Sequence, residues 1–352
     1  MAKTGRPALD ALDRQLVRLL EQRCTELGAA EGTCPVESVA EAQQSAARIV
    51  ADAQIEDEKV ADAIQEIMRH VVGQTMATRT RVRTSYLGPP YSYSHLAAIK
   101  YFGETSQLIP LASISAVFES ILRHDCQTGV VPIENSTDGR IVDTLGMFLK
   151  HRVHICGEIL LPIHHNLLSR TPLEQINEVY SKPQALSQCR NWLAQHLPAA
   201  RLIEMSSTTA AAQLAAESPG AAAIASSEAA ARYGLETLAA SIEDNRQNMT
   251  RFAILGSTPT APTGNDKTAL LIQVPHEPGA LADVMNLFKR AKLNLTWIES
   301  FPLPGSLSEY LFFVELEGHQ QDPSVAQTIK RLARRTKRLE ILGSYAKGTV
   351  QR

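Results

Sequence analysis

The chain has 352 residues, enough for two or three domains with buried cores. Hydrophobic residues make up 44% and charged residues 20% of it, as in ordinary globular proteins. Its 35 basic and 37 acidic residues nearly cancel, which argues against binding to nucleic acid. No window is apolar enough to span a membrane, and we expect no secretory signal. Five scattered cysteines predict reduced thiols in a cytoplasmic protein.

The first part of the chain, residues 8–77, is predicted to be helical throughout. Apolar residues recur there at three- and four-residue steps, which is the period of a helix with one apolar face. They are Leu9, Leu12, Leu16, Leu19, Leu20 and Leu27, followed by Val60, Ile64, Ile67 and Val71. Such faces must pack against each other or against a second subunit, so we expect an all-α helical bundle or a dimer-forming hairpin over residues 1–80.

From residue 84 the pattern changes to short apolar strands that alternate with helical segments. The predicted strands are 85–87, 129–133, 153–163, 177–180, 201–204 and 222–225, and the helices include 184–196, 208–217 and 227–233. This alternation predicts an α/β domain over residues 84–258, with mainly parallel strands. A Pro-, Gly- and Thr-rich linker, 256–264, ends it.

The last segment, residues 265–348, has a β-α-β-β-α-β order typical of an α+β ferredoxin-like unit. Its predicted strands are 268–274, 295–301, 309–317 and 338–344, and its helices are 279–291 and 323–335. Gly279 begins the first helix, where free backbone N–H groups can meet a ligand carboxylate.

Polar side chains stand in several loops that join a strand to a helix in the α/β domain. Each is either a simple helix cap or part of an anion site. These side chains are Ser92, Ser94, Asn135, Ser136, Ser207 and Thr208. Thr250 and Arg251, at the start of another strand, add a hydroxyl donor and a guanidinium that could clamp a carboxylate. Together they predict a site for a small dicarboxylate, with no metal or cofactor.

These stretches resemble the prephenate dehydratase family. The matching segments are Gly88–His95, Val131–Ser136 with Gly139, Gly157-Glu158, Lys182–Leu186, Ser206–Thr208, and Ile242–Asn245 through Asn248–Phe252. The resemblance implies a catalytic domain of two α/β lobes like a periplasmic binding protein, about 84–162 plus 246–258 and 163–245. It also implies that prephenate binds between the lobes and loses carbon dioxide and hydroxide to give phenylpyruvate in phenylalanine biosynthesis.

By the same resemblance, Thr250 is the catalytic hydroxyl and Arg251 holds a substrate carboxylate. Ser92, Ser94, Asn135, Ser136, Ser207 and Thr208 would line the cleft. The chain departs from the family pattern at Tyr91, where glycine is usual, and at Lys182, where histidine is usual.

Residues 265–348 resemble an ACT regulatory domain, which implies feedback control by L-phenylalanine. The residues that match its effector site are Gly279, Ala280, Leu281, Asn294, Glu299 and Ser300. Phe301 replaces an arginine of the family motif, so a charge-assisted donor is lost. Such domains usually pair, so we expect a homodimer or homotetramer.

The overall layout resembles that of bifunctional chorismate mutase/prephenate dehydratases. Arg6, Arg23 and Gln74 match mutase positions, but a lysine near 34 and the polar group of the second helix are missing. We therefore expect a degenerate mutase-like domain over residues 1–80.

Three alternatives remain open for the whole chain. It could be a fully bifunctional enzyme with an intact mutase. It could be an arogenate dehydratase, which acts on the amino-acid counterpart of prephenate. It could also be a non-catalytic ligand-binding regulator, because two-lobed domains and ACT domains both occur as sensors.

Overall fold

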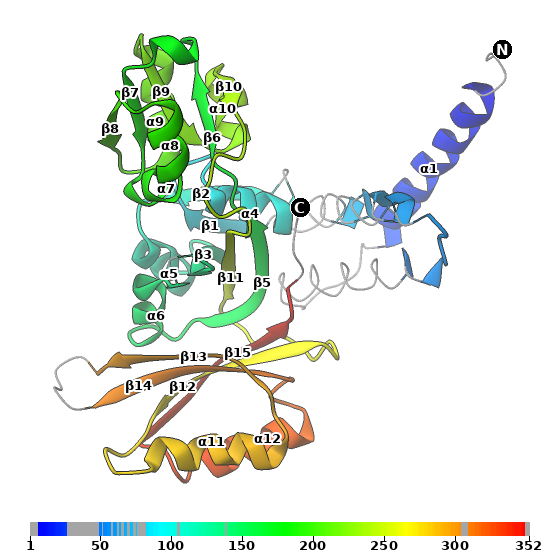
Figure 1. The fold of residues 1–352 in the computed structure, drawn as a ribbon. Helices are drawn as coiled ribbons and strands as arrows, with labels where there is room; N and C mark the ends of the chain where they lie inside the picture. Colours follow the sequence, from blue (N-terminus) through cyan, green and yellow to red (C-terminus); the bar gives the residue numbers. More distant parts are fainter. Residues whose placement is uncertain are drawn as a thin grey trace.

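A computed structural model describes residues 6–26, 49–50, 52–57, 59–61, 63–64, 67–68, 71–72, 75, 82–103, 106–137, 139–303 and 309–348. It contains two α/β lobes, a third unit beneath them, and an N-terminal helix that extends to one side (Figure 1). Each of the three units is built on its own sheet. No helix among the described residues is long and apolar enough to cross a membrane.

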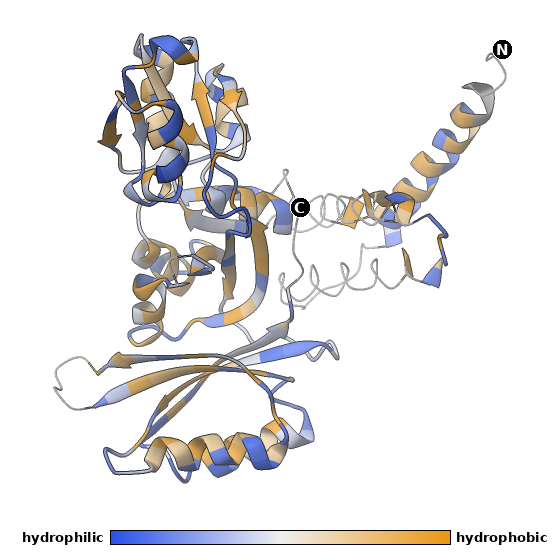
Figure 2. Ribbon diagram, viewed as in Figure 1, coloured by the Kyte–Doolittle hydropathy of each residue, from blue (hydrophilic) through white to orange (hydrophobic). Residues whose placement is uncertain are grey.

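Helix α1 (Arg6–Glu26) is the described element of the N-terminal region. Hydrophobic residues recur along this helix, as the orange bands in Figure 2 show, and they include the leucines of the predicted stripe. Four leucines of the stripe are more than half exposed, namely Leu9 (59%), Leu12 (59%), Leu16 (51%) and Leu19 (62%), whereas Leu20 is partly buried. The expected packing of this stripe within a bundle is therefore not seen among the described residues.

The first lobe is a sheet in the order β2-β1-β3-β11-β5, with β4 paired to β3. The strands and the helices that flank them are β1 (Arg83–Leu87), α4 (Tyr93–Phe102), β2 (Gln107–Leu111), α5 (Ile114–Leu122), β3 (Thr128–Asn135), β4 (Gly139–Arg140), α6 (Val142–Phe148), β5 (His154–Pro162) and β11 (Met249–Gly256). Strand β11 is buried on both faces, because α4 and α5 cover the sheet from opposite sides.

The second lobe lies between β5 and β11 in the sequence and has a sheet in the order β10-β6-β9-β7-β8. Its elements are β6 (Asn166–Ser169), a 3-10 turn (Leu173–Gln175), β7 (Glu178–Ser181), α7 (Pro183–Gln188), α8 (Arg190–His196), β8 (Arg201–Glu204), α9 (Thr208–Glu217), β9 (Ala221–Ala225), α10 (Ser227–Tyr233) and β10 (Glu236–Ala239). Small alanines on β9 and α9 let the helix pack closely on the sheet.

The expectation of mainly parallel strands is wrong. β1 pairs in parallel with β2 and β3, and β7 with β8 and β9. However, β11 is antiparallel to both β3 and β5, and β6 is antiparallel to β9 and β10. The chain leaves the first lobe after β5, enters the second lobe as β6 and returns as β11. β6 and β11 each run against the parallel strands of their own sheet. Both sheets are therefore mixed.

The third unit has the predicted β-α-β-β-α-β order. Its elements are β12 (Asp266–Gln273), α11 (Ala280–Ala291), β13 (Leu295–Pro302), β14 (Tyr310–Glu317), α12 (Pro323–Leu332) and β15 (Arg338–Ala346). One face of its antiparallel sheet packs on α11 and α12, and the opposite face packs on the first lobe (Figure 1). One continuous apolar core therefore joins the first lobe to the third unit, through residues such as Ile155, Leu255, Leu271 and Phe313.

Candidate functional site

A cleft of about 360 Å³ lies between the two α/β lobes. It is lined from the first lobe by the loop before α4, the end of β3 and the start of β11, and from the second lobe by α7 and the loop before α9. Of the predicted site residues, it contains Ser92, Ser94, Asn135, Ser207, Thr208 and Thr250. Side chains distant in the sequence thus meet because both lobes direct strand-to-helix loops at the same space.

Two of the predicted serines are helix N-caps at the cleft. The Ser92 hydroxyl accepts a hydrogen bond from the His95 backbone N–H (3.4 Å), which caps α4. The Ser207 hydroxyl accepts one from the Ala210 N–H (3.0 Å), which caps α9. The caps orient the first turns of both helices toward the cleft, where their dipoles favour negative charge.

Thr250 is held by Asn135 across adjacent strands. The Asn135 side-chain amide donates to the Thr250 hydroxyl oxygen at 2.8 Å. The Asn135 carbonyl oxygen accepts from the Thr137 N–H at 2.9 Å, which supports this orientation of the amide. Because the Thr250 oxygen accepts from Asn135, its hydrogen is directed to another acceptor. Thr250 can thus donate to a group bound in the cleft.

Arg251 does not line the cleft, and this corrects the prediction that it holds a substrate carboxylate. Successive residues of a strand face opposite sides, so Thr250 and Phe252 face the cleft while Arg251 faces the third unit. Its guanidinium forms ion pairs with Glu158 (2.6 Å), Glu134 (3.3 Å) and Glu315 of β14. Burial disfavours its charge, but the carboxylates of Glu158 and Glu315 raise the pKa of Arg251.

A buried charge cluster therefore joins the two units behind the cleft. Lys267 of β12 lies 3.0 Å from Glu158 and 3.2 Å from Glu315. The Tyr345 hydroxyl donates to Glu315 at 2.7 Å, and Trp297 places its ring 5.3 Å from the Arg251 guanidinium carbon. Strand alternation was the sequence signal that Thr250 and Arg251 face opposite sides of β11, because neighbouring side chains of a strand point to different faces.

Ser136 is also absent from the cleft lining. Its hydroxyl accepts from the Met249 N–H (2.9 Å) and donates to the Gln247 carbonyl (3.3 Å). Ser136 thus ties the turn after β3 to the segment that enters β11. This contact supports the position of Thr250 rather than contributing to the lining.

The structure adds cleft residues that were not among the predicted site residues, including Tyr93, His165, Lys182 and Gln188. His165 Nε2 lies 2.8 Å from the Gln188 side-chain oxygen. Tyr93 donates to the His164 carbonyl, and burial raises the pKa of Tyr93 well above its ordinary value. Lys182 comes directly after a strand of the second lobe, and this position in the sequence could have indicated that it lines the cleft.

Tyr91 stands beside the cleft in a left-handed conformation, with φ of 65°. A glycine adopts this conformation without strain, which explains why glycine suits this position. In this chain the Tyr91 ring packs on His95 and lies 5.8 Å from the Arg232 guanidinium of the second lobe. The substitution thus adds a contact between the lobes.

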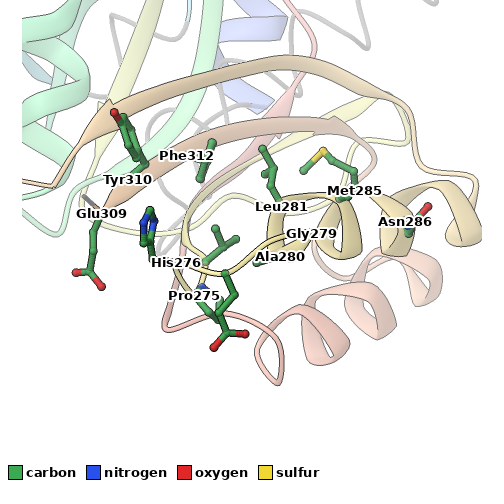
Figure 3. Close-up of a pocket in the computed structure, with 13 residues that line it drawn as sticks. Pro275, His276, Gly279, Ala280, Leu281, Met285, Asn286, Glu309, Tyr310 and Phe312 are labelled. Atoms are coloured by element: carbon green, nitrogen blue, oxygen red, sulfur yellow. The ribbon is translucent and has the colours of Figure 1, made fainter. Parts of the chain in front are cut away.

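A second cavity, of about 690 Å³, lies in the third unit at the start of α11 (Figure 3). Gly279, Ala280 and Leu281 line it, together with Met285, Glu309, Tyr310 and Phe312. Gly279 has φ of 84°, a conformation that favours glycine, and it starts α11 without a side-chain cap.

The other predicted effector residues do not line this cavity. Glu299 faces the first lobe, where it forms an ion pair with Arg140 (2.6 Å). Phe301, which replaces the motif arginine, packs against the core shared with the first lobe. Asn294 and Ser300 are likewise outside the lining. In this chain, Glu299 and Phe301 of β13 contribute to the contact between the third unit and the first lobe.

Of the predicted mutase positions, Arg23 has a described contact, from its Nε to the Thr75 hydroxyl (3.4 Å). Arg6 is the first residue of α1. Gln74 lies outside the described residues. The predicted mutase site therefore stays a prediction.

The fold and cleft define a two-lobed α/β protein with a C-terminal ACT domain. The family model for prephenate dehydratase matches residues 84–260, and the model for the ACT domain matches residues 268–334. The chain belongs to the prephenate dehydratase family.

Among similar proteins, a bifunctional chorismate mutase/prephenate dehydratase of Pseudomonas aeruginosa is 34% identical over 99% of this chain and 98% of its own. The structure of a prephenate dehydratase in complex with L-Phe from Arthrobacter aurescens has a TM-score of 0.70, with 32% identity over 76% of this chain and 90% of its own. The structure of GqqA, described as a novel type of quorum quenching acylase, has a TM-score of 0.68, with 28% identity over 75% of this chain and 98% of its own. Function must therefore be argued from the site and not from the fold alone.

Proposed function

We propose that the chain is a prephenate dehydratase, which converts prephenate to phenylpyruvate, water and carbon dioxide. The observation that carries this proposal is the Thr250 hydroxyl, held by Asn135 with its hydrogen left to donate into a cleft between two lobes. The described lining residues include no aspartate or glutamate, which suits a dianionic substrate.

The chemistry requires a proton donor at one end of the substrate ring. The bond to the ring carboxylate breaks to release carbon dioxide, and its electron pair enters the ring. The ring becomes aromatic as the bond to the hydroxyl group breaks. Hydroxide is a poor leaving group, so a hydrogen bond or proton from Thr250 at the departing oxygen lowers the barrier. With one proton taken up from water, the leaving group becomes water and the reaction balances.

The test is turnover of prephenate by the purified full-length chain, followed by the absorbance of phenylpyruvate. Arogenate is assayed in parallel, with phenylalanine as the product. Turnover of prephenate supports the proposal, and exclusive turnover of arogenate replaces it with the arogenate reaction. Binding of prephenate without turnover would instead support a non-catalytic regulator.

We propose L-phenylalanine as the effector, bound in the cavity at the start of α11. An amino acid needs a partner for its carboxylate and one for its ammonium group. The backbone N–H groups of the first turn of α11 suit the carboxylate, and Glu309 suits the ammonium group. The related structure in complex with L-Phe supports the same ligand.

A second candidate activity is chorismate mutase. The relative that is named bifunctional matches 99% of this chain, including the N-terminal region. We propose that this region, residues 1–80, is a mutase-like helical domain, followed by a catalytic domain over 84–258 and an ACT domain over 265–348. An assay with chorismate alone separates a retained mutase, which consumes it, from a degenerate one, which leaves it unchanged.

We also propose that the chain forms a homodimer or homotetramer in the cytoplasm. The exposed leucine stripe of α1 supports assembly, because such a surface is normally buried. Cys126 and Cys189 are free thiols, as in proteins of a reducing compartment. Sedimentation of the purified chain tests the assembly state.

A further inference from the structure

The charge that lines the interlobe cleft comes from very few residues. Among the described lining residues, Lys182 is the only lysine or arginine. The other ionisable side chains there are Tyr93 and His165. Tyr93 stays neutral because burial raises its pKa, and His165 is engaged with Gln188. A dianion in this cleft therefore meets one permanent side-chain cation.

Lys182 stands at the edge of the second lobe where two parallel strands end. It follows β7 directly, and the Met205 N–H after β8 donates to the Ser181 carbonyl at 2.8 Å. Lys182 is thus placed beside the loop that carries Ser207 and leads into α9. The ammonium group, the capping serine and the N-terminus of a ten-residue helix gather at one edge of the lobe.

The ammonium group of Lys182 is available for a ligand. The side chain is exposed, and none of the ion pairs between described residues involves it. Arg251, by contrast, is paired with glutamates on the far side of β11. A lysine is a compact cation on a flexible stem, so it can adjust to the position of a bound carboxylate.

The shape of the substrate gives this cation a specific task. In prephenate, the hydroxyl group and the two carboxylate-bearing groups are attached to opposite carbons of the ring. A hydrogen bond from Thr250 in the first lobe to the hydroxyl group directs the carboxylates away from that lobe. We propose that Lys182 binds one of these carboxylates and acts as a substrate-binding residue, an inference that rests on the prephenate dehydratase function proposed above.

The experiment compares four forms of the full-length enzyme: wild type, Lys182→Gln, Lys182→Arg and Lys182→His. Steady-state rates with prephenate are measured between pH 6 and pH 8, and thermal unfolding checks the fold. Lys182→Gln is expected to raise KM about tenfold to a hundredfold, with kcat within about threefold, because a charge-assisted contact to bound substrate is lost. Lys182→Arg keeps the charge and should hold KM within about threefold.

The histidine variant supplies a readout that a purely structural role would not change. An imidazole is charged at pH 6 and largely neutral at pH 8, so KM of Lys182→His should rise toward that of Lys182→Gln across this range. Lys330→Gln, on the exposed side of α12, controls for the loss of one positive charge elsewhere on the surface.

The outcomes separate this inference from the proposed function. Wild-type turnover with an unchanged KM in Lys182→Gln would overturn the role of Lys182 alone. A fall in kcat at unchanged KM would also overturn it, because the ammonium group would then act in the chemical step. A wild-type enzyme without prephenate turnover would overturn the proposed function, and the inference with it.

Discussion

Arg251 Nε lies 2.6 Å from a carboxylate oxygen of Glu158, on the side of β11 opposite to Thr250. The strand that presents the candidate catalytic hydroxyl to the cleft therefore presents its next residue to the ACT domain. The cluster around Arg251 includes Glu315 and Lys267, which belong to the ACT sheet. Thr250 thus stands one residue away from the buried charged contact between the two units.

Replacement of Arg251 by methionine should destabilise the protein strongly. Among the described residues, the change leaves Lys267 as the one cation paired with the buried Glu158 and Glu315, and breaking a buried ion pair in this way costs about 3–5 kcal/mol. The free energy of unfolding in urea measures this loss. Arg140→Ala is the matched control, because its partly exposed pair with Glu299 should contribute about 1 kcal/mol or less. Unchanged stability with lost prephenate binding would return Arg251 to the substrate site.

The stability of the fold should fall in acid because of Glu315. Burial alone would raise the pKa of Glu315, but Arg251 and Lys267 outweigh burial and lower it. A carboxyl group with a lowered pKa in the folded state contributes stability above its unfolded pKa, near 4.5, and this is lost as pH falls further. The urea midpoint should therefore decline below about pH 4.5, and less steeply in Glu315→Gln.

Glu178→Gln is the control for this acid dependence. The pKa of Glu178 is also lowered, chiefly by hydrogen bonds from Tyr180 and Arg201, but this group lies at the surface. Its removal should leave the acid profile close to that of the wild type. If the dependence of the urea midpoint on pH became equally shallow in both variants, the buried cluster would contribute no more to acid stability than a surface pair does.

Thr250→Ala should lower kcat for prephenate by about a hundredfold to a thousandfold, because the leaving hydroxyl loses its donor. Thr250→Ser keeps the hydroxyl and should retain most of the activity. Binding of prephenate by calorimetry and the thermal midpoint should change little in either variant. Near-normal turnover by Thr250→Ala would exclude the proposed role.

Tyr310→Ala should weaken phenylalanine binding about tenfold, because it removes aromatic surface from the cavity at α11. Tyr310→Phe keeps the ring and should bind phenylalanine almost as the wild type does. Tyr310 is 49% exposed, so the stability of the fold should change little. Thermal shifts with added L-phenylalanine provide the measurement. Equal binding by both variants would place the effector elsewhere.

The sequence by itself determined much of the local structure. Helices α9 and α10 begin and end at the predicted residues, because Ser207 and Ser226 cap their N-termini and the apolar pattern defines their length. The order of elements in the ACT domain follows in the same way from alternating apolar residues. Local capping and periodicity are properties of neighbouring residues, so the sequence alone reveals them.

The cleft could be predicted only in part. Loop hydroxyls such as Ser92 and Ser207 were expected to line one site because each stands between a strand and a helix. They do meet in the cleft, although they belong to different lobes. Lys182 was noted as a departure from the family pattern, but its place as a cleft cation depends on how the second lobe faces the first.

The tertiary structure alone decided the role of Arg251. Strand alternation separates Thr250 from Arg251, but it does not tell which of the two faces the cleft. That choice depends on the ACT sheet, which brings Glu315 and Lys267 to the back of β11. Glu315 lies more than sixty residues after Arg251 in the sequence, and Lys267 lies sixteen residues after it. A buried guanidinium is stable only where such carboxylates surround it, and their arrival is a consequence of domain packing.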